Sequence, residues 1–215
     1  MKKFTIWLVL VLSVGVAGYA IYSYAALPPG STVAPGMKTT YQAHKTRILL
    51  HVFCAAVALI TGPFQFFPVV RQRRALHRRI GYVYFAAVLT GGVAGLAMAF
   101  IAYGGLVSRL GFGALAVLWL YTAGMALLAI RRKSYVAHEV WAIRCFALTF
   151  AAVTLRLYLG MFFALGFAFD DFYPALSWLC WVPNLLFVEW IILRGHKQPT
   201  LPEPAARTVG GSSQT

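Results

Sequence analysis

Two histidines occupy positions from which one cofactor can take a ligand on each side. His77 and His138 each follow a short basic run, residues 71–74 and 131–133, and each stands near the start of a predicted apolar helix. Two imidazoles from different helices at one membrane depth are the arrangement that holds a haem b through both axial positions. The alternative is that both histidines face water beside basic loops. His77 and His138 are therefore the candidate haem ligands.

A second set of ionisable side chains lies deeper in the predicted helices. At about 1.5 Å per residue, Arg156 reaches the depth of His51. A cation inside lipid needs an anion, an acceptor or a path to water. Two interpretations stay open. Either Arg156 extends to the outer headgroups and His51 forms a hydrogen bond within the bundle, or the two side chains contact an anion, a quinone or a haem propionate.

One carboxylate, Glu189, lies clearly inside a predicted span, near the cytoplasmic end of the last one. Arg144 lies at a similar depth in the preceding span. Because an ionised group inside a membrane costs less when it is paired, we predict a structural ion pair between Arg144 and Glu189. Arg144 also remains a candidate contact to a cofactor.

Membrane helices must position these side chains. Of 215 residues, 60% are hydrophobic and only 11% are charged, whereas a soluble domain carries about 25% charged residues. This composition excludes an ordinary cytosolic protein, a disordered chain and a secreted disulfide scaffold. Six apolar segments are each long enough to cross a hydrocarbon core of about 30 Å as a helix. They are residues 4–24, 47–70, 80–103, 110–130, 141–167 and 175–193.

The predicted fold class is therefore all-α, a polytopic membrane protein with six transmembrane helices. We divide it into an N-terminal anchor (1–25), an outside loop (26–46), a five-helix bundle (47–194) and a disordered cytoplasmic tail (195–215). The first apolar run follows two lysines, as in a signal peptide. Its length of about 20 residues exceeds the usual 7–15 of a signal-peptide core, so we favour an uncleaved anchor.

The charge distribution predicts that both termini face the cytoplasm. The chain has 19 Lys and Arg against 5 Asp and Glu, a net charge of +14. These charges lie between apolar runs, so they indicate topology and contact with anionic lipids on the cytoplasmic side. They do not indicate a nucleic-acid partner, because no segment forms a water-soluble basic face. The predicted inside set is Arg71, Arg73, Arg74, Arg78, Arg79, Arg131, Arg132, Lys133, Arg144, Arg194, Lys197 and Arg207.

Four sequence pieces resemble a known family. They are His51 with the Gly-Pro-Phe-Gln of residues 62–65, the Leu-His-Arg-Arg-Ile-Gly-Tyr of 76–82, the His-Glu-Val-Trp-Ala-Ile-Arg of 138–144, and the Ala-Ala-Val-Thr-Leu-Arg of 151–156. Together they resemble the bacterial multi-pass membrane family known as domain of unknown function 2306. The resemblance implies a bundle in the bacterial cytoplasmic (inner) membrane and brings no established activity. Its histidine placement is similar to that of two-haem cytochromes b, but the four paired histidines of that pattern are not present.

Three functional hypotheses follow. The first is a haem-binding or redox-associated membrane protein, with His77 and His138 as ligands and Arg144, Arg156 or His51 contacting propionates or a quinone. The second is a cofactor-free accessory or assembly factor that contacts another membrane protein through its helices. The third is a small solute or proton transporter with His51, Arg156 and Glu189 along its path, which predicts a continuous polar cavity between them.

Overall fold

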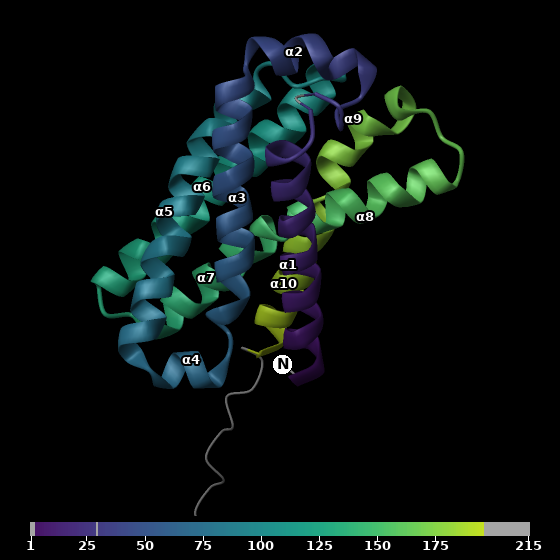
Figure 1. Cartoon of the computed structure of the whole chain (residues 1–215). Helices are drawn as coiled ribbons and strands as arrows, with labels where there is room; N and C mark the ends of the chain where they lie inside the picture. Colours follow the sequence, from purple (N-terminus) through teal and green to yellow (C-terminus); the bar gives the residue numbers. More distant parts are fainter. Residues whose placement is uncertain (1–2, 29, 196–215) are drawn as a thin grey trace, which may run out of the picture.

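The chain is built from α-helices over the residues that the structure, a computed structural model, describes, 3–28 and 30–195 (Figure 1). The helix bounds follow the apolar runs, with polar first turns added at several N-termini. The elements are α1 (Lys3–Ala25), the 3-10 helix η1 (Pro35–Met37), α2 (Lys38–Ala43), α3 (Lys45–Phe64), α4 (Pro68–Gln72), α5 (Arg74–Ala99), α6 (Gly105–Arg131), α7 (Tyr135–Thr149), α8 (Ala151–Ala164), α9 (Phe169–Leu179) and α10 (Val182–Gly195).

Within the described ranges, six helical segments are long and apolar enough to cross a membrane, which confirms the predicted all-α, six-span class. Four are the single helices α1, α3, α5 and α6, and two are the helix pairs α7–α8 and α9–α10. The second span ends at Phe64 and not at residue 70, because Phe67 precedes Pro68 and is held in extended backbone. The third begins at Arg74, six residues before the expected residue 80, because its basic first turns are helical too.

Two connections define the ends of the bundle. We call the end that carries residues 26–44 the outer end, and the end that carries α4 the inner end, following the orientation that the charges predict. The outer segment, expected as irregular chain, contains η1 and α2. Residues 196–215, expected as a disordered tail, lie outside the described residues.

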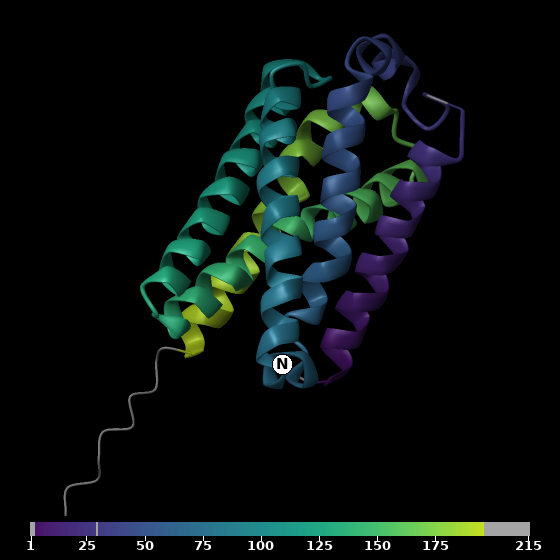
Figure 2. The ribbon, with the colours of Figure 1, turned by 60° about the vertical axis from the view of Figure 1, so that its left-hand side comes forward.

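The spans form one bundle in which α1, α3, α5, α6 and α7 pack in chain order, whereas α9 packs mainly on α6 and α10 mainly on α7 (Figures 1 and 2). The closest packing is between α3 and α5. A Cβ atom on Gly91 would lie 3.0 Å from the Cβ of Cys54, and one on Gly95 would lie 2.8 Å from the Nδ1 of His51. These two glycines therefore let the helices approach closely, as small residues four apart do in membrane bundles.

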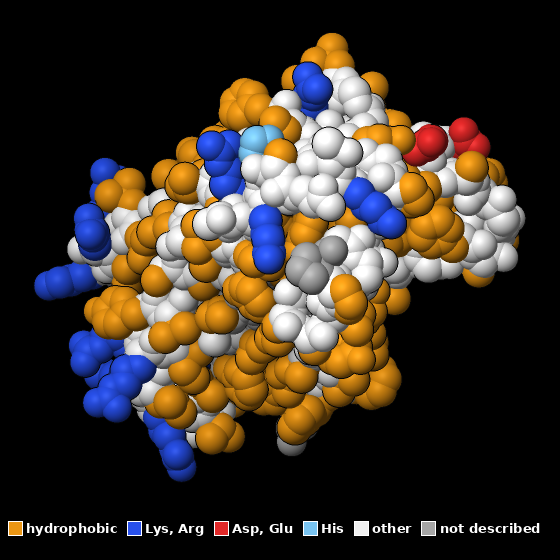
Figure 3. Space-filling model, turned by 45° about the horizontal axis from the view of Figure 1, so that its top comes forward, with side chains coloured by type: hydrophobic (Ala, Val, Ile, Leu, Met, Phe, Trp, Pro, Cys, Tyr) orange, Lys and Arg blue, Asp and Glu red, His pale blue; other side chains and the backbone are white. Residues whose placement is uncertain are grey.

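The last two spans are interrupted half-way. Phe150 separates α7 from α8, and Cys180 and Trp181 separate α9 from α10. The pair α7–α8 crosses the bundle obliquely, and α8 and α9 together project to one side (Figures 1 and 2). Hydrophobic side chains cover much of the face in Figure 3, and acidic side chains appear at one edge of it. Asp170 and Asp171 lie in the first turn of α9.

Candidate functional site

The inner end of the bundle contains a cavity of about 570 Å³ that both candidate haem ligands line. His77 reaches it from the first turns of α5, and His138 reaches it from the first turns of α7. Each histidine lies four residues after the N-cap of its helix and closes the first helical turn. The His77 amide donates to the Arg73 carbonyl (3.0 Å), and the His138 amide donates to the Ser134 carbonyl (2.9 Å). The structure thus brings together two histidines that are 61 residues apart.

The two imidazoles differ in how their ring nitrogens are used. The Nδ1 of His138 lies 2.9 Å from the carbonyl oxygen of Ala126 on α6. Because a carbonyl only accepts, Nδ1 carries the hydrogen and the lone pair is on Nε2. Metal-bound histidines have this arrangement. The Nδ1 of His77 is buried and has no hydrogen-bond partner among the described residues, and the same holds for the amide nitrogen of Gln65, which lines the same cavity.

Aromatic and cationic side chains complete the inner cavity. Phe66, Phe85 and Phe146 line it, and so do two arginines at its polar rim, Arg71 and Arg74. The Arg71 guanidinium donates two hydrogen bonds to the Glu139 carboxylate, at 2.9 and 3.1 Å, and both side chains are about half exposed.

Arg144 and Glu189 are brought together, but away from this cavity. The Arg144 guanidinium donates to both carboxylate oxygens of Glu189, at 2.5 and 2.8 Å. The Arg144 guanidinium also lies over the Trp141 ring, 4.5 Å from its centroid. Neither Arg144 nor Glu189 lines either cavity described here. Arg144 and Glu189 thus form an ion pair between α7 and α10.

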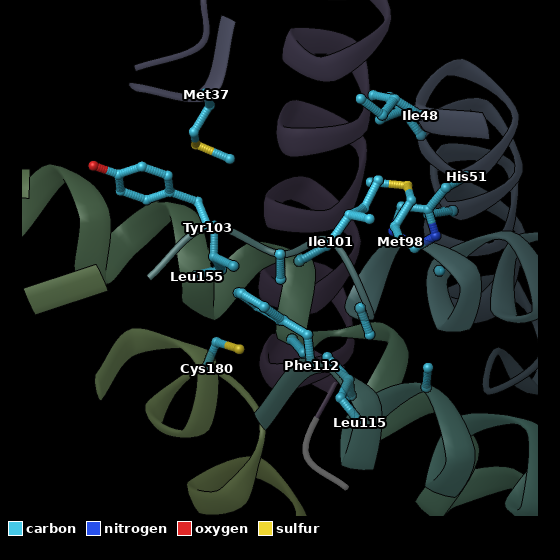
Figure 4. A pocket seen from close by; sticks show the side chains of 18 of the residues that line it. Met37, Ile48, His51, Met98, Ile101, Tyr103, Phe112, Leu115, Leu155 and Cys180 are labelled. Atoms are coloured by element: carbon cyan, nitrogen blue, oxygen red, sulfur yellow. The ribbon is translucent and has the colours of Figure 1, made fainter. Parts of the chain in front are cut away.

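His51 and Arg156 lie in a second cavity, of about 320 Å³, at the outer end. It is enclosed by most of the spans and by the segment before α3, and Figure 4 shows His51 and Tyr103 entering it from opposite sides. The Nδ1 of His51 donates to the Gly91 carbonyl oxygen at 2.8 Å, which leaves its Nε2 lone pair free. The Arg156 guanidinium donates to the Ala152 carbonyl oxygen at 3.0 Å, one turn earlier in α8.

A hydrogen bond at the outer rim changes the acidity of one tyrosine. The Tyr103 hydroxyl, between α5 and α6, donates to the Asp170 carboxylate at 2.7 Å. Ionising this phenol removes the bond and places two negative charges together. The interaction therefore raises the pKa of Tyr103 above its ordinary value.

A buried polar cluster separates the two cavities. The Thr149 hydroxyl donates to the Cys145 carbonyl oxygen (3.0 Å) and accepts from the Trp119 indole N–H (2.9 Å) and from the Tyr84 hydroxyl (2.8 Å). Trp119 and Thr149 line the outer cavity, and Tyr84 lines the inner one. The cluster thus fills the space between them with satisfied hydrogen bonds. Sequence reasoning missed it, although a threonine and a tyrosine inside apolar runs were the signal.

One comparison with known proteins identifies the family. The model of the family described as "Predicted membrane protein (DUF2306)" matches residues 48–192. The chain belongs to this family. The DUF2306 match begins in α3 and ends in α10. It covers the inner cavity, the cluster and most of the outer cavity, and it leaves out α1 and the segment before α3, which complete the outer cavity. No curated protein and no solved structure matches the chain.

Proposed function

We propose that this protein is a haem b-binding, redox-associated protein of the bacterial cytoplasmic membrane, with His77 and His138 as the two axial ligands. The observation that carries the proposal is that both imidazoles line one cavity. Its volume of about 570 Å³ lies within the range of about 300–1,000 Å³ that cofactor and ligand pockets occupy.

The state of the two rings supports the same proposal. His138 is oriented by its bond to Ala126, so its Nε2 is available as a ligand without further movement of the proton. His77 has a buried Nδ1 without a partner, and such a group normally has a protein, water or ligand partner. A ligand between the two rings would change the environment of both.

The rest of the cavity suits a large flat ring with acidic side groups. Phenylalanine side chains provide the apolar walls, and Arg71 and Arg74 provide positive charge at the rim, where propionates are recognised. These two arginines replace Arg144, Arg156 and His51 as the candidate propionate contacts, since those three do not line the inner cavity. Haem, when bound, would supply one-electron oxidation and reduction.

The transporter hypothesis fits the geometry less well. It predicts a continuous polar cavity from His51 to Glu189. Glu189 is instead paired with Arg144, and the Thr149 cluster lies between the outer and inner cavities. The hypothesis of a cofactor-free assembly factor leaves a cavity lined by two histidines without a role.

A reduced-minus-oxidised absorbance spectrum tests the proposal. The protein is purified in neutral detergent from cells with ample haem supply. We expect a sharp α-band for the natural chain and its loss in His77→Ala and in His138→Ala. The matched control is His44→Ala, because His44 lies between α2 and α3 and lines neither cavity.

A ligand exchange makes the test specific. His77→Met keeps an iron ligand, so we expect haem to be retained with a higher reduction potential, as for Met/His ligation. A flat spectrum from pure natural protein, or equal haem content in all four histidine variants, would contradict the proposal.

A further inference from the structure

The outer cavity contains a cation that no carboxylate of the described residues neutralises. Arg156 lies in α8, the second half of the fifth span, and lines this cavity, and its guanidinium donates to a backbone carbonyl, that of Ala152. The four carboxylates of the described residues are committed or remote from it. Glu139 pairs with Arg71, Glu189 pairs with Arg144, Asp170 accepts from Tyr103 at the rim, and Asp171 is exposed on α9.

The charge of Arg156 therefore calls for an anion from outside the part of the chain that the structure describes. A guanidinium presents its donors as a planar fork that matches a carboxylate in a bidentate pair. One such group compensates one charge, which favours a monoanion over a phosphate monoester. In a site largely removed from water, the attraction between the two charges is stronger than at a surface.

The walls of the cavity define the rest of the ligand. They are mainly apolar, with aliphatic side chains such as Ile48, Leu115 and Leu155 around the space in Figure 4. Its volume of about 320 Å³ is near the lower limit of about 300 Å³ for small-molecule sites. A diacyl lipid is too large for this space, whereas one short alkyl chain with a compact head is of suitable size.

We propose that the outer cavity binds a single-chain fatty-acid carboxylate, with its head against the Arg156 guanidinium. The alkyl chain lies along the apolar wall between α3, α6 and α8. The free Nε2 of His51, fixed by the Nδ1 bond to Gly91, faces the ligand as a further polar contact. This site is separate from the proposed haem site, and neither inference depends on the other.

Tryptophan quenching by a brominated acid tests the proposal in neutral lipid nanodiscs. The probe is ω-bromododecanoate, and the comparison is ω-bromododecanol, which has the same chain without the charge. Trp119 lines the cavity and reports occupancy, so Trp119→Phe identifies the quenching that comes from this site. We expect saturable quenching by the acid and at least tenfold weaker quenching by the alcohol.

Substitutions of Arg156 test whether its positive charge is what binds the carboxylate. Arg156→Gln should weaken acid binding about ten- to hundredfold, the loss expected for a charged hydrogen bond, while leaving the weak alcohol binding unchanged. Arg156→Lys should retain most of the affinity. Arg109→Gln is the matched control, because Arg109 is an exposed arginine of α6 outside the cavity.

Two results would overturn the proposal. One is equal quenching by acid and alcohol in the natural chain, which needs no variant to fold. The other is acid binding by Arg156→Gln at natural affinity. His77→Ala separates the two proposals, because it should lose haem and keep acid binding. A chain that binds the acid and no haem would refute only the proposed function.

Discussion

The pair between Arg144 and Glu189 allows a stability prediction with a built-in control. Both side chains are largely shielded, with 19% and 33% exposed, and the carboxylate accepts two hydrogen bonds from the guanidinium. Arg144→Gln or Glu189→Gln leaves the other charge without its partner inside the bundle. Removing one partner of a buried pair costs about 3–5 kcal/mol. The partial exposure lowers our expectation to about 2–3 kcal/mol for each single variant.

The double variant should lose less than the sum. Because it leaves no unpaired charge, we expect a coupling free energy of about 1–3 kcal/mol in the double-mutant cycle. The assay is thermal unfolding of detergent-purified protein, where 1 kcal/mol corresponds to about 2–4 °C in a chain of this size. Each single variant should therefore lower the melting temperature by about 4–12 °C.

The matched control is the pair between Arg71 and Glu139. It has the same two functional groups and also forms two hydrogen bonds, but its side chains are 49% and 48% exposed. Its cycle should give about 0–1 kcal/mol. Additive losses of stability at Arg144 and Glu189, or equal coupling free energies in the two pairs, would show that burial does not set the strength of the Arg144–Glu189 pair.

Three further predictions address the outer half of the molecule. Gly95→Ala places a methyl group 2.8 Å from the His51 Nδ1, so it should cost about 1–3 kcal/mol of unfolding free energy. Thr149→Val leaves the buried Trp119 indole N–H without an acceptor, while the Tyr84 hydroxyl keeps the Cys145 Sγ, so it should cost about 1–3 kcal/mol. The Tyr103 phenol should ionise above the ordinary tyrosine pKa in an ultraviolet titration, and Asp170→Asn should lower its pKa. Because the folded-state pKa is the raised one, this contribution to stability is lost as pH rises through it.

Each of these has a reference variant and a result that contradicts it. Gly113→Ala meets only an ordinary contact, 3.8 Å from Ala99, so equal destabilisation at both glycines would rule out the His51 contact as the cause. Thr61→Val removes a hydroxyl that bonds only to carbonyls of its own helix, and a loss as large as that of Thr149→Val would contradict the role of the cluster. An unchanged Tyr103 titration in Asp170→Asn would contradict the hydrogen bond.

Helix number and depth followed from the sequence because a lipid environment leaves few alternatives. An apolar run of about 20 residues must be a helix there, and a rise of 1.5 Å per residue converts position into depth. That arithmetic placed Glu189 beside Arg144, and His77 at the level of His138. In the structure, Glu189 and Arg144 form an ion pair, and His77 and His138 line one cavity.

The two cavities could not be predicted from the sequence, because they depend on packing between segments that are distant along the chain. Depth alone placed His51 and Arg156 at one level, but it did not show which helix faces line the space between them. The tautomer of His51 depends on a carbonyl of α5 that is 40 residues away. From the sequence alone, Arg71 and Arg74 indicate only the membrane orientation. The positions of the apolar runs do not show whether an arginine beside a run faces water or lines a cavity.

The interruption at Phe150 lies in the wall of the outer cavity, which residues on both sides of it line. A break inside a lipid-embedded helix frees backbone groups, and these persist only where other groups satisfy them. Asn184 on α10 does this across the break. Its side-chain amide donates to the carbonyl of Ala147 before it (3.4 Å) and to the Thr154 hydroxyl after it (2.9 Å). Because one side chain bonds to both halves of the span, the polar groups beside the interruption are paired next to the outer cavity, which Thr149 lines before the interruption and Ala151 and Arg156 line after it.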